Sequence, residues 1–174
     1  MNTGNIHIFV SYSRHDQLLV TPIVQLIRAI GGGVFQDVDS IPPGKRWKPV
    51  IQDSIDRASV VLVFWCAHSR SSKEVHAEWE QAILANKDVV PTRLDDTPLD
   101  EALAEFQSID LRALAAGHLG KLNGKHKLLP GEADLARHRL FDARHANHLR
   151  HVDTAFVARS AQYICDFVVR QFGS

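Results

Sequence analysis

The sequence predicts an α/β domain in which a parallel sheet is covered by helices, and three observations lead to this class. Short apolar runs alternate along the chain with segments whose apolar residues recur at helical spacing. The run at residues 60–65 (VVLVFW) is apolar on both faces, which is typical of a central parallel strand. The 174 residues, of which 45% are hydrophobic and 23% charged, suit one globular domain with a real core.

The first half of the chain predicts two strands and two helices. A strand at residues 6–10 (IHIFV) leads into the polar loop SYSRHD, where Asp16 is placed to cap a helix. Gly31–Gly33 end that helix. Its apolar residues lie on one face: Leu19, Ile23, Leu26, Ile27 and Ile30. A second strand is expected at residues 34–37. The loop at residues 38–47 (VDSIPPGKRW) is irregular because of its two prolines and glycine, and a helix begins near Pro49.

The second half continues the alternation and then becomes less regular. After the third strand at residues 60–65, Ser69–Ser72 interrupt the chain and are placed to cap a helix. A fourth strand follows at residues 88–92, where Pro91 weakens its end or places it near an edge. A short helix at 99–106 and a brief fifth strand at 109–111 complete a core of residues 1–112. Residues 113–174 are expected to form a loop-rich insertion and a closing helix of the same domain.

Composition excludes several classes of function. The formal net charge is zero, so neither nucleic acid nor an anionic membrane is an expected partner. No apolar stretch reaches about 18 residues, and the N-terminus lacks a signal-peptide pattern. Cys66 and Cys165 make no disulfide framework or zinc spacing, which favours reduced thiols and a cytoplasmic location. We predict no metal site, because no clear partner set accompanies four neighbouring histidines: His138, His145, His148 and His151.

The order of these landmarks resembles that of TIR (Toll/interleukin-1 receptor) domains. Five segments carry the resemblance over about residues 6–112: IHIFVSYSRHD, FQDVDSIPPGKRW, VVLVFWCAHSRSSKEVHAEWEQAI, DVVPTRLDD and FQSIDLR. Each segment alone is weak evidence for the family, but all five occur in the order and at the spacing typical of TIR domains. The resemblance implies a flavodoxin-like three-layer fold with a central parallel five-stranded sheet, here with a C-terminal helical extension.

The resemblance also implies two kinds of function. Many TIR domains assemble with one another through the loop after the second strand, which is represented here by Asp39, Pro42, Pro43, Gly44, Lys45 and Arg46. Others cleave NAD+ at the nicotinamide–ribose bond, often as an immune or antiphage signal. The catalytic glutamate of those enzymes matches Glu78. Those enzymes commonly carry tryptophan four residues before the glutamate, where this sequence has Glu74. Trp79 directly follows Glu78 and points about 100° away from it around the helix, so it is no simple substitute.

Helix geometry gives Glu78 independent support. In a flavodoxin-like sheet, ligands bind where the strand order reverses, between the first and third strands, and the helix after the third strand begins there. Glu78 lies roughly 85° from the centre of the apolar face, whereas Glu80 and Glu74 lie at about 115° and 125°. Cleavage of NAD+, the substrate, passes through an oxocarbenium-like transition state, and nicotinamide leaves as a neutral molecule. One carboxylate therefore suffices to stabilise the developing positive charge, and no cofactor is needed. The sequence has no HExxH, P-loop or GxSxG motif.

Supporting residues and the choice of function stay open. Ser11, Tyr12 and Arg14 are placed to line the cleft, with Arg14 pairing with a phosphate. Phe35 or Trp47 would stack on a ring, although Trp47 and Trp79 are more typical of a core. Ser69 and Ser72 would bind substrate or cap the helix. We expect a stand-alone NAD+ nucleosidase or cyclase, resembling the TIR component of Thoeris-type defence and active as a homo-oligomer. The alternative is a non-catalytic adaptor or decoy that binds other TIR domains.

Overall fold

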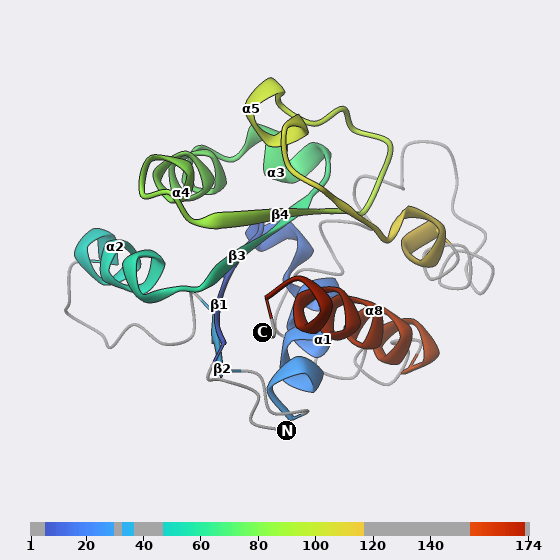
Figure 1. The fold of residues 1–174 in the computed structure, drawn as a ribbon. Helices are drawn as coiled ribbons and strands as arrows, with labels where there is room; N and C mark the ends of the chain where they lie inside the picture. The colour runs from blue at the N-terminus through green and yellow to red at the C-terminus, as the bar shows by residue number, and fades with distance from the viewer. Residues whose placement is uncertain (1–5, 30–32, 37–46, 117–153, 173–174) are drawn as a thin grey trace.

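The computed structural model describes residues 6–29, 33–36, 47–116 and 154–172 (Figure 1). Five strands form one parallel sheet in the order β2-β1-β3-β4-β5. They are β1 (His7–Ser11), β2 (Gly33–Gln36), β3 (Val60–Trp65), β4 (Asp88–Arg93) and β5 (Ile109–Asp110). The helices are the 3-10 turn η1 (Arg14–Asp16), then α1 (Gln17–Ala29), α2 (Trp47–Arg57), α3 (Ala67–Ser71), α4 (Lys73–Leu84), α5 (Glu101–Ala104) and α8 (Thr154–Phe172). This order confirms the predicted flavodoxin-like fold.

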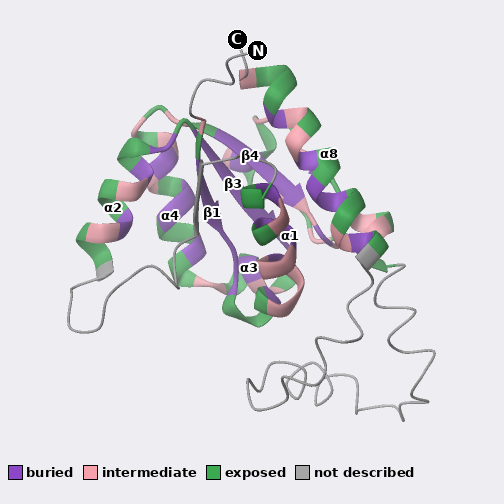
Figure 2. Cartoon of the chain, turned by 90° about the horizontal axis from the view of Figure 1, so that it is seen from below, coloured by how far each residue is buried: buried purple, intermediate pink, exposed green. Residues whose placement is uncertain are grey.

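The sheet separates two apolar cores, one on each face. Alternate residues of β3 point in opposite directions, so Val60, Leu62 and Phe64 join one core while Val61, Val63 and Trp65 join the other. Helices α1 and α8 cover the first core, and α2, α4 and α5 cover the second. In Figure 2 the strands are buried between helices whose outer faces are exposed. All six β3 residues are buried, as the unbroken apolar run predicts.

The C-terminal helix is part of this architecture. Helix α8 lies beside α1 on the same face of the sheet (Figure 1). It buries one apolar stripe in the first core: Phe156, Ala161, Ile164 and Val168. The predicted closing helix is therefore confirmed. None of the described helices combines the length and the apolar character that a membrane crossing requires.

Three local details add to the sequence-based expectations. The segment after β3 is not only a break, because Ala67–Ser71 form the short helix α3. Ser13 caps η1 by accepting a hydrogen bond of 3.4 Å from the His15 N–H, and the carboxylate of Asp16, the last residue of η1, contacts Cys66 and His68. Pro91 lies near an edge of the sheet, as expected. The edge strand β5 pairs only with Thr92 and Arg93 of β4, so Pro91, without a backbone donor, lies beyond that pairing.

Candidate functional site

The topological switch point lies between β1 and β3. From β1 the chain moves outward to β2, and from β3 it continues in the opposite direction to β4 and β5. Both strands are parallel and paired in register, with Ser11 at the end of β1 opposite Val63. Their carboxyl ends therefore open at the same edge of the sheet, where ligands bind in this class of fold. The segments that leave this edge are residues 12–16 and 66–72.

Glu78 is a buried carboxylate at this switch point. It lies on α4 and is only 6% exposed. The hydroxyl of Ser11, which is fully buried, donates a hydrogen bond of 2.6 Å to Oε2 of Glu78. This distance is at the short end of the range for O–H···O hydrogen bonds. The last residue of β1 is thus joined directly to the middle of α4, across 67 positions of sequence.

The two neighbouring glutamates of α4 face solvent instead. Glu74 and Glu80 are both exposed. Glu74 lies in the first turn, where its own backbone N–H and then the Ser72 hydroxyl, at 3.0 Å, lower the pKa of its carboxyl. Ser72 caps the helix by accepting a hydrogen bond of 3.3 Å from the Val75 N–H. Of the three candidates on this helix, Glu78 is the one that the fold turns inward.

Trp79 belongs to the second apolar core. It is 4% exposed and packs in the second core, and its ring lies 4.5 Å from that of His76. Within the described residues, its Nε1 has no hydrogen-bond partner. This placement agrees with the core interpretation of Trp79 and with the helical rotation that separates it from Glu78.

The loop after β1 contributes side chains of two kinds. Tyr12 is buried in the first core, whereas Arg14 is exposed near this edge of the sheet. Ser69, from the segment after β3, is 1% exposed and donates to the Phe64 carbonyl at 2.6 Å. The structure thus gives Ser69 and Ser72 local structural partners. Contact of Tyr12, Arg14, Ser69 or Ser72 with a substrate stays a prediction.

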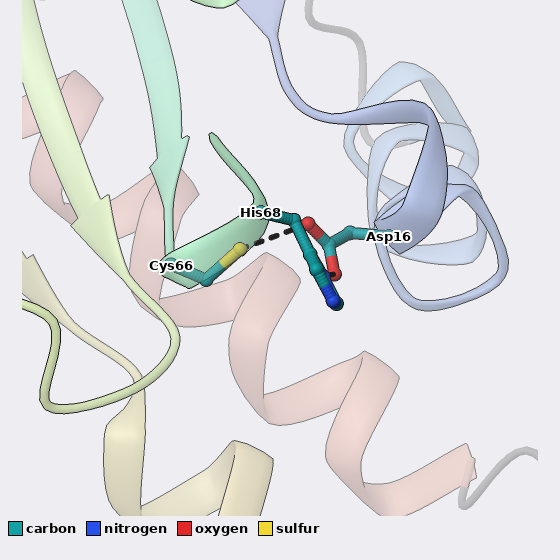
Figure 3. Close-up of side chains that lie close together, drawn as sticks. All are labelled: Asp16, Cys66 and His68. Atoms are coloured by element: carbon teal, nitrogen blue, oxygen red, sulfur yellow. Dashed lines mark hydrogen bonds and ion pairs between the residues drawn. The ribbon is translucent and has the colours of Figure 1, made fainter. Parts of the chain in front are cut away.

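A second polar cluster joins the same two segments (Figure 3). The thiol of Cys66 donates to Oδ2 of Asp16 at 2.9 Å, and Nδ1 of His68 lies 2.9 Å from Oδ1. Burial, followed by the neighbouring Asp16 carboxylate, raises the pKa of the Cys66 thiol to about 12. Sequence reasoning missed this cluster. The available signal was that Asp16 follows β1 closely, while Cys66 and His68 follow β3, the adjacent strand.

Several predicted site residues lie outside what the structure describes. The assembly loop, Asp39–Arg46, is outside the described residues, as are His138, His145, His148 and His151. The backbones of Phe35 and Trp47 belong to β2 and α2, but their side chains are not described. Their predicted roles stay predictions.

Comparison with known proteins places this geometry in context. Residues 8–122 match the TIR domain family. The TIR domain of the Toll-related receptor TRR-2 from the lower metazoan Hydra magnipapillata is similar with a TM-score of 0.54 and 14% identity, over 64% of this chain and 93% of that one. The TIR domains of the activated Roq1 resistosome, which recognises the pathogen effector XopQ, are similar with a TM-score of 0.56 and 16% identity. This match covers 94% of this chain and 99% of that one. No curated protein matches.

Proposed function

Because the chain belongs to the TIR domain family, we propose that it is an NAD+ nucleosidase that uses Glu78 to cleave the nicotinamide–ribose bond. The family includes both NAD+-cleaving enzymes and signalling adaptors. One observation carries the choice of an enzyme and of this residue. Glu78 is the buried glutamate of α4, held by Ser11 at 2.6 Å, at the edge of the sheet where this fold binds ligands.

The proposed chemistry needs a fixed negative charge rather than a general acid. As the glycosidic bond breaks, positive charge develops on the ribose, and nicotinamide leaves as a neutral molecule. The Glu78 carboxylate stabilises that charge and orients the ribose hydroxyls. A carboxylate fixed before the reaction has no reorganisation to undergo at the transition state, which makes it more effective than the same charge in water. Ser11 fixes the rotamer of the carboxylate through Oε2.

The nucleophile that captures the cation determines the product. Water gives ADP-ribose, whereas an internal nucleophile of the substrate gives a cyclic isomer. In either case the product is a small diffusible nucleotide, which suits an immune or antiphage signal of the kind that the Thoeris TIR component produces. Arg14, exposed beside the site, is placed to pair with the pyrophosphate.

Burial of Glu78 predicts that the free monomer is a slow enzyme. Because only 6% of its surface is exposed, the ribose reaches Glu78 only after the residues that cover it move. We propose that self-association through Asp39–Arg46 favours the open arrangement, as a ligand favours the state that it binds better. TIR domains commonly self-associate, and one structural neighbour comes from an activated resistosome.

A non-catalytic interaction module is the second candidate, and two observations favour it. The bond between Ser11 and Glu78 links β1 to α4, as a purely structural hydrogen bond does. Glu74 also occupies the position where the enzymes commonly carry tryptophan. Under this function, reversing the charges of Lys45 and Arg46 would abolish association measured by sedimentation, and NAD+ would stay intact.

The test is nicotinamide release from NAD+ by the wild type and three matched variants, followed by chromatography over a wide range of protein concentrations. We expect Glu78→Gln to lower the rate at least about a hundredfold. Glu74→Gln and Glu80→Gln, on the exposed face of the same helix, are expected to stay within a few-fold of the wild type. Equal loss in all three variants would refute the assignment of Glu78. Absence of release by the assembled wild type would favour the interaction module.

A further inference from the structure

Three donor atoms of different chemistry converge at the carboxyl ends of β1 and β3. They are a carboxylate oxygen of Asp16, the sulfur of Cys66 and a ring nitrogen of His68, and all lie within 4.8 Å of one another. Asp16 ends η1, Cys66 follows β3 directly, and His68 lies in α3. Figure 3 shows the three side chains pointing toward one another from these separate segments.

We propose that Asp16, Cys66 and His68 bind one zinc-class divalent transition-metal ion. A thiolate, an imidazole and a carboxylate are the ligands that zinc uses, whereas Mg²⁺ and Ca²⁺ prefer oxygen alone. This inference concerns residues other than Glu78 and does not depend on the cleavage of NAD+.

The distances permit such an ion after a small adjustment. Bond lengths of about 2.0–2.3 Å in a tetrahedral site separate neighbouring donor atoms by roughly 3.3–3.5 Å. The Cys66 sulfur lies 2.9 Å from Oδ2 of Asp16 and Nδ1 of His68 lies 2.9 Å from Oδ1, so the two donors now contact different oxygens of the carboxylate. One carboxylate oxygen, the sulfur and a ring nitrogen lie within 4.8 Å of one another, so the separations must change by up to about 1.5 Å to reach the tetrahedral values. The proposal requires the three side chains to rotate by this amount.

Burial and surroundings suit an ion with one open position. Asp16 is 8% exposed and Cys66 is 5% exposed, whereas 33% of the His68 side chain is exposed. Solvent therefore reaches the cluster from the His68 side and supplies the fourth ligand. The His15 ring, 5.2 Å from that of His68, borders the same side. A bound ion would tie the segment after β1 to the segment after β3, on the two sides of the switch point.

Metal binding replaces two hydrogen bonds, releases the thiol proton and moves the proton of His68 from Nδ1 to Nε2, so that Nδ1 coordinates the ion. In the structure, the Cys66 thiol donates to Asp16 and so carries its proton, and this proton passes to solvent when the thiolate coordinates the ion. The competing explanation is a network in which Asp16 accepts from Cys66 and pairs with His68 solely to connect the two segments. The two explanations differ in one observable, a metal–sulfur bond.

Cobalt substitution reports that bond. The full chain, without a histidine tag and kept reduced by a phosphine, is titrated with Co²⁺ and then with Zn²⁺. We expect a near-ultraviolet thiolate-to-cobalt band that saturates at one Co²⁺ per chain and disappears when Zn²⁺ displaces it. The band should be absent from Cys66→Ser and present in Cys165→Ser, which removes the other free cysteine.

Two further sets of variants make the result decisive. Asp16→Asn and His68→Gln, with folding verified by circular dichroism, should weaken Co²⁺ binding at least about tenfold. Replacing His138, His145, His148 and His151 together with alanine should leave the thiolate band unchanged. A folded wild type that gives no thiolate band, or a band that survives Cys66→Ser, would overturn the proposal. If Cys66→Ser does not fold, unchanged affinity in Asp16→Asn and His68→Gln would overturn it equally.

Discussion

The hydrogen bond between Ser11 and Glu78 predicts a measurable coupling free energy. Ser11 is fully buried, Glu78 is 6% exposed, and the two oxygen atoms are 2.6 Å apart. Hydrogen bonds to a charged group contribute about 1.5–3 kcal/mol to stability. The free energies of unfolding of the wild type, Ser11→Ala, Glu78→Ala and the double variant should therefore deviate from additivity by about that amount. The methylene groups that Glu78→Ala removes are lost in both backgrounds, so their contribution cancels.

The assay is urea unfolding followed by circular dichroism, with the denaturant slope checked for equality across variants. A control cycle combines Ser11→Ala with Glu80→Ala, an exposed glutamate of the same helix, and should be additive within about 0.5 kcal/mol. The reasoning is refuted if the Ser11–Glu78 cycle is equally additive, because the buried bond would then contribute nothing that depends on both partners.

Two other predictions test the fold. Ile164→Ala should destabilise the domain by about 2–5 kcal/mol, because Ile164 on α8 is fully buried in the first core. Tyr163, the preceding residue, is 48% exposed, so Tyr163→Ala should change the free energy of unfolding by no more than about 1 kcal/mol. An equal effect of both substitutions in chemical denaturation would contradict the packing of α8. The pKa of Asp110 should be about 2, because Arg112 donates two side-chain hydrogen bonds to its carboxylate. In Arg112→Gln that pKa should rise toward about 3.9, and an ordinary wild-type value in a carboxyl-carbon NMR titration would contradict the pairing.

Local patterns were sufficient to predict most of the fold. The prediction for β3 matches the observed Val60–Trp65, because a strand buried on both faces must be apolar at every position. The inward orientation of Glu78 also followed from the helical rotation that separates it from Glu74 and Glu80. These features depend on residues within a few positions of one another, which a single sequence displays directly.

Contacts between distant segments were not accessible in the same way. The bond from Ser11 to Glu78 spans 67 positions, and that from Cys66 to Asp16 spans 50. Asp16 resembled a helix cap, because its local sequence gives no sign of the thiol and imidazole that the parallel pairing of β1 and β3 brings to it. Helix α3 was missed for a related reason. Its five residues, AHSRS, are too few to show an apolar period, and four of them are polar, as in a loop.

We propose that the Glu78 carboxylate, positioned by Ser11, cleaves NAD+. The most direct test of this claim is the rate of nicotinamide release by the wild type, Ser11→Ala and Glu78→Gln at one protein concentration high enough for assembly. We predict a graded series. If the bond acts fully in the transition state, losing about 1.5–3 kcal/mol slows Ser11→Ala by roughly ten- to 150-fold. Glu78→Gln, which loses the charge itself, should be slower than Ser11→Ala and at least about a hundredfold slower than the wild type. Release at the wild-type rate from Glu78→Gln would contradict the claim.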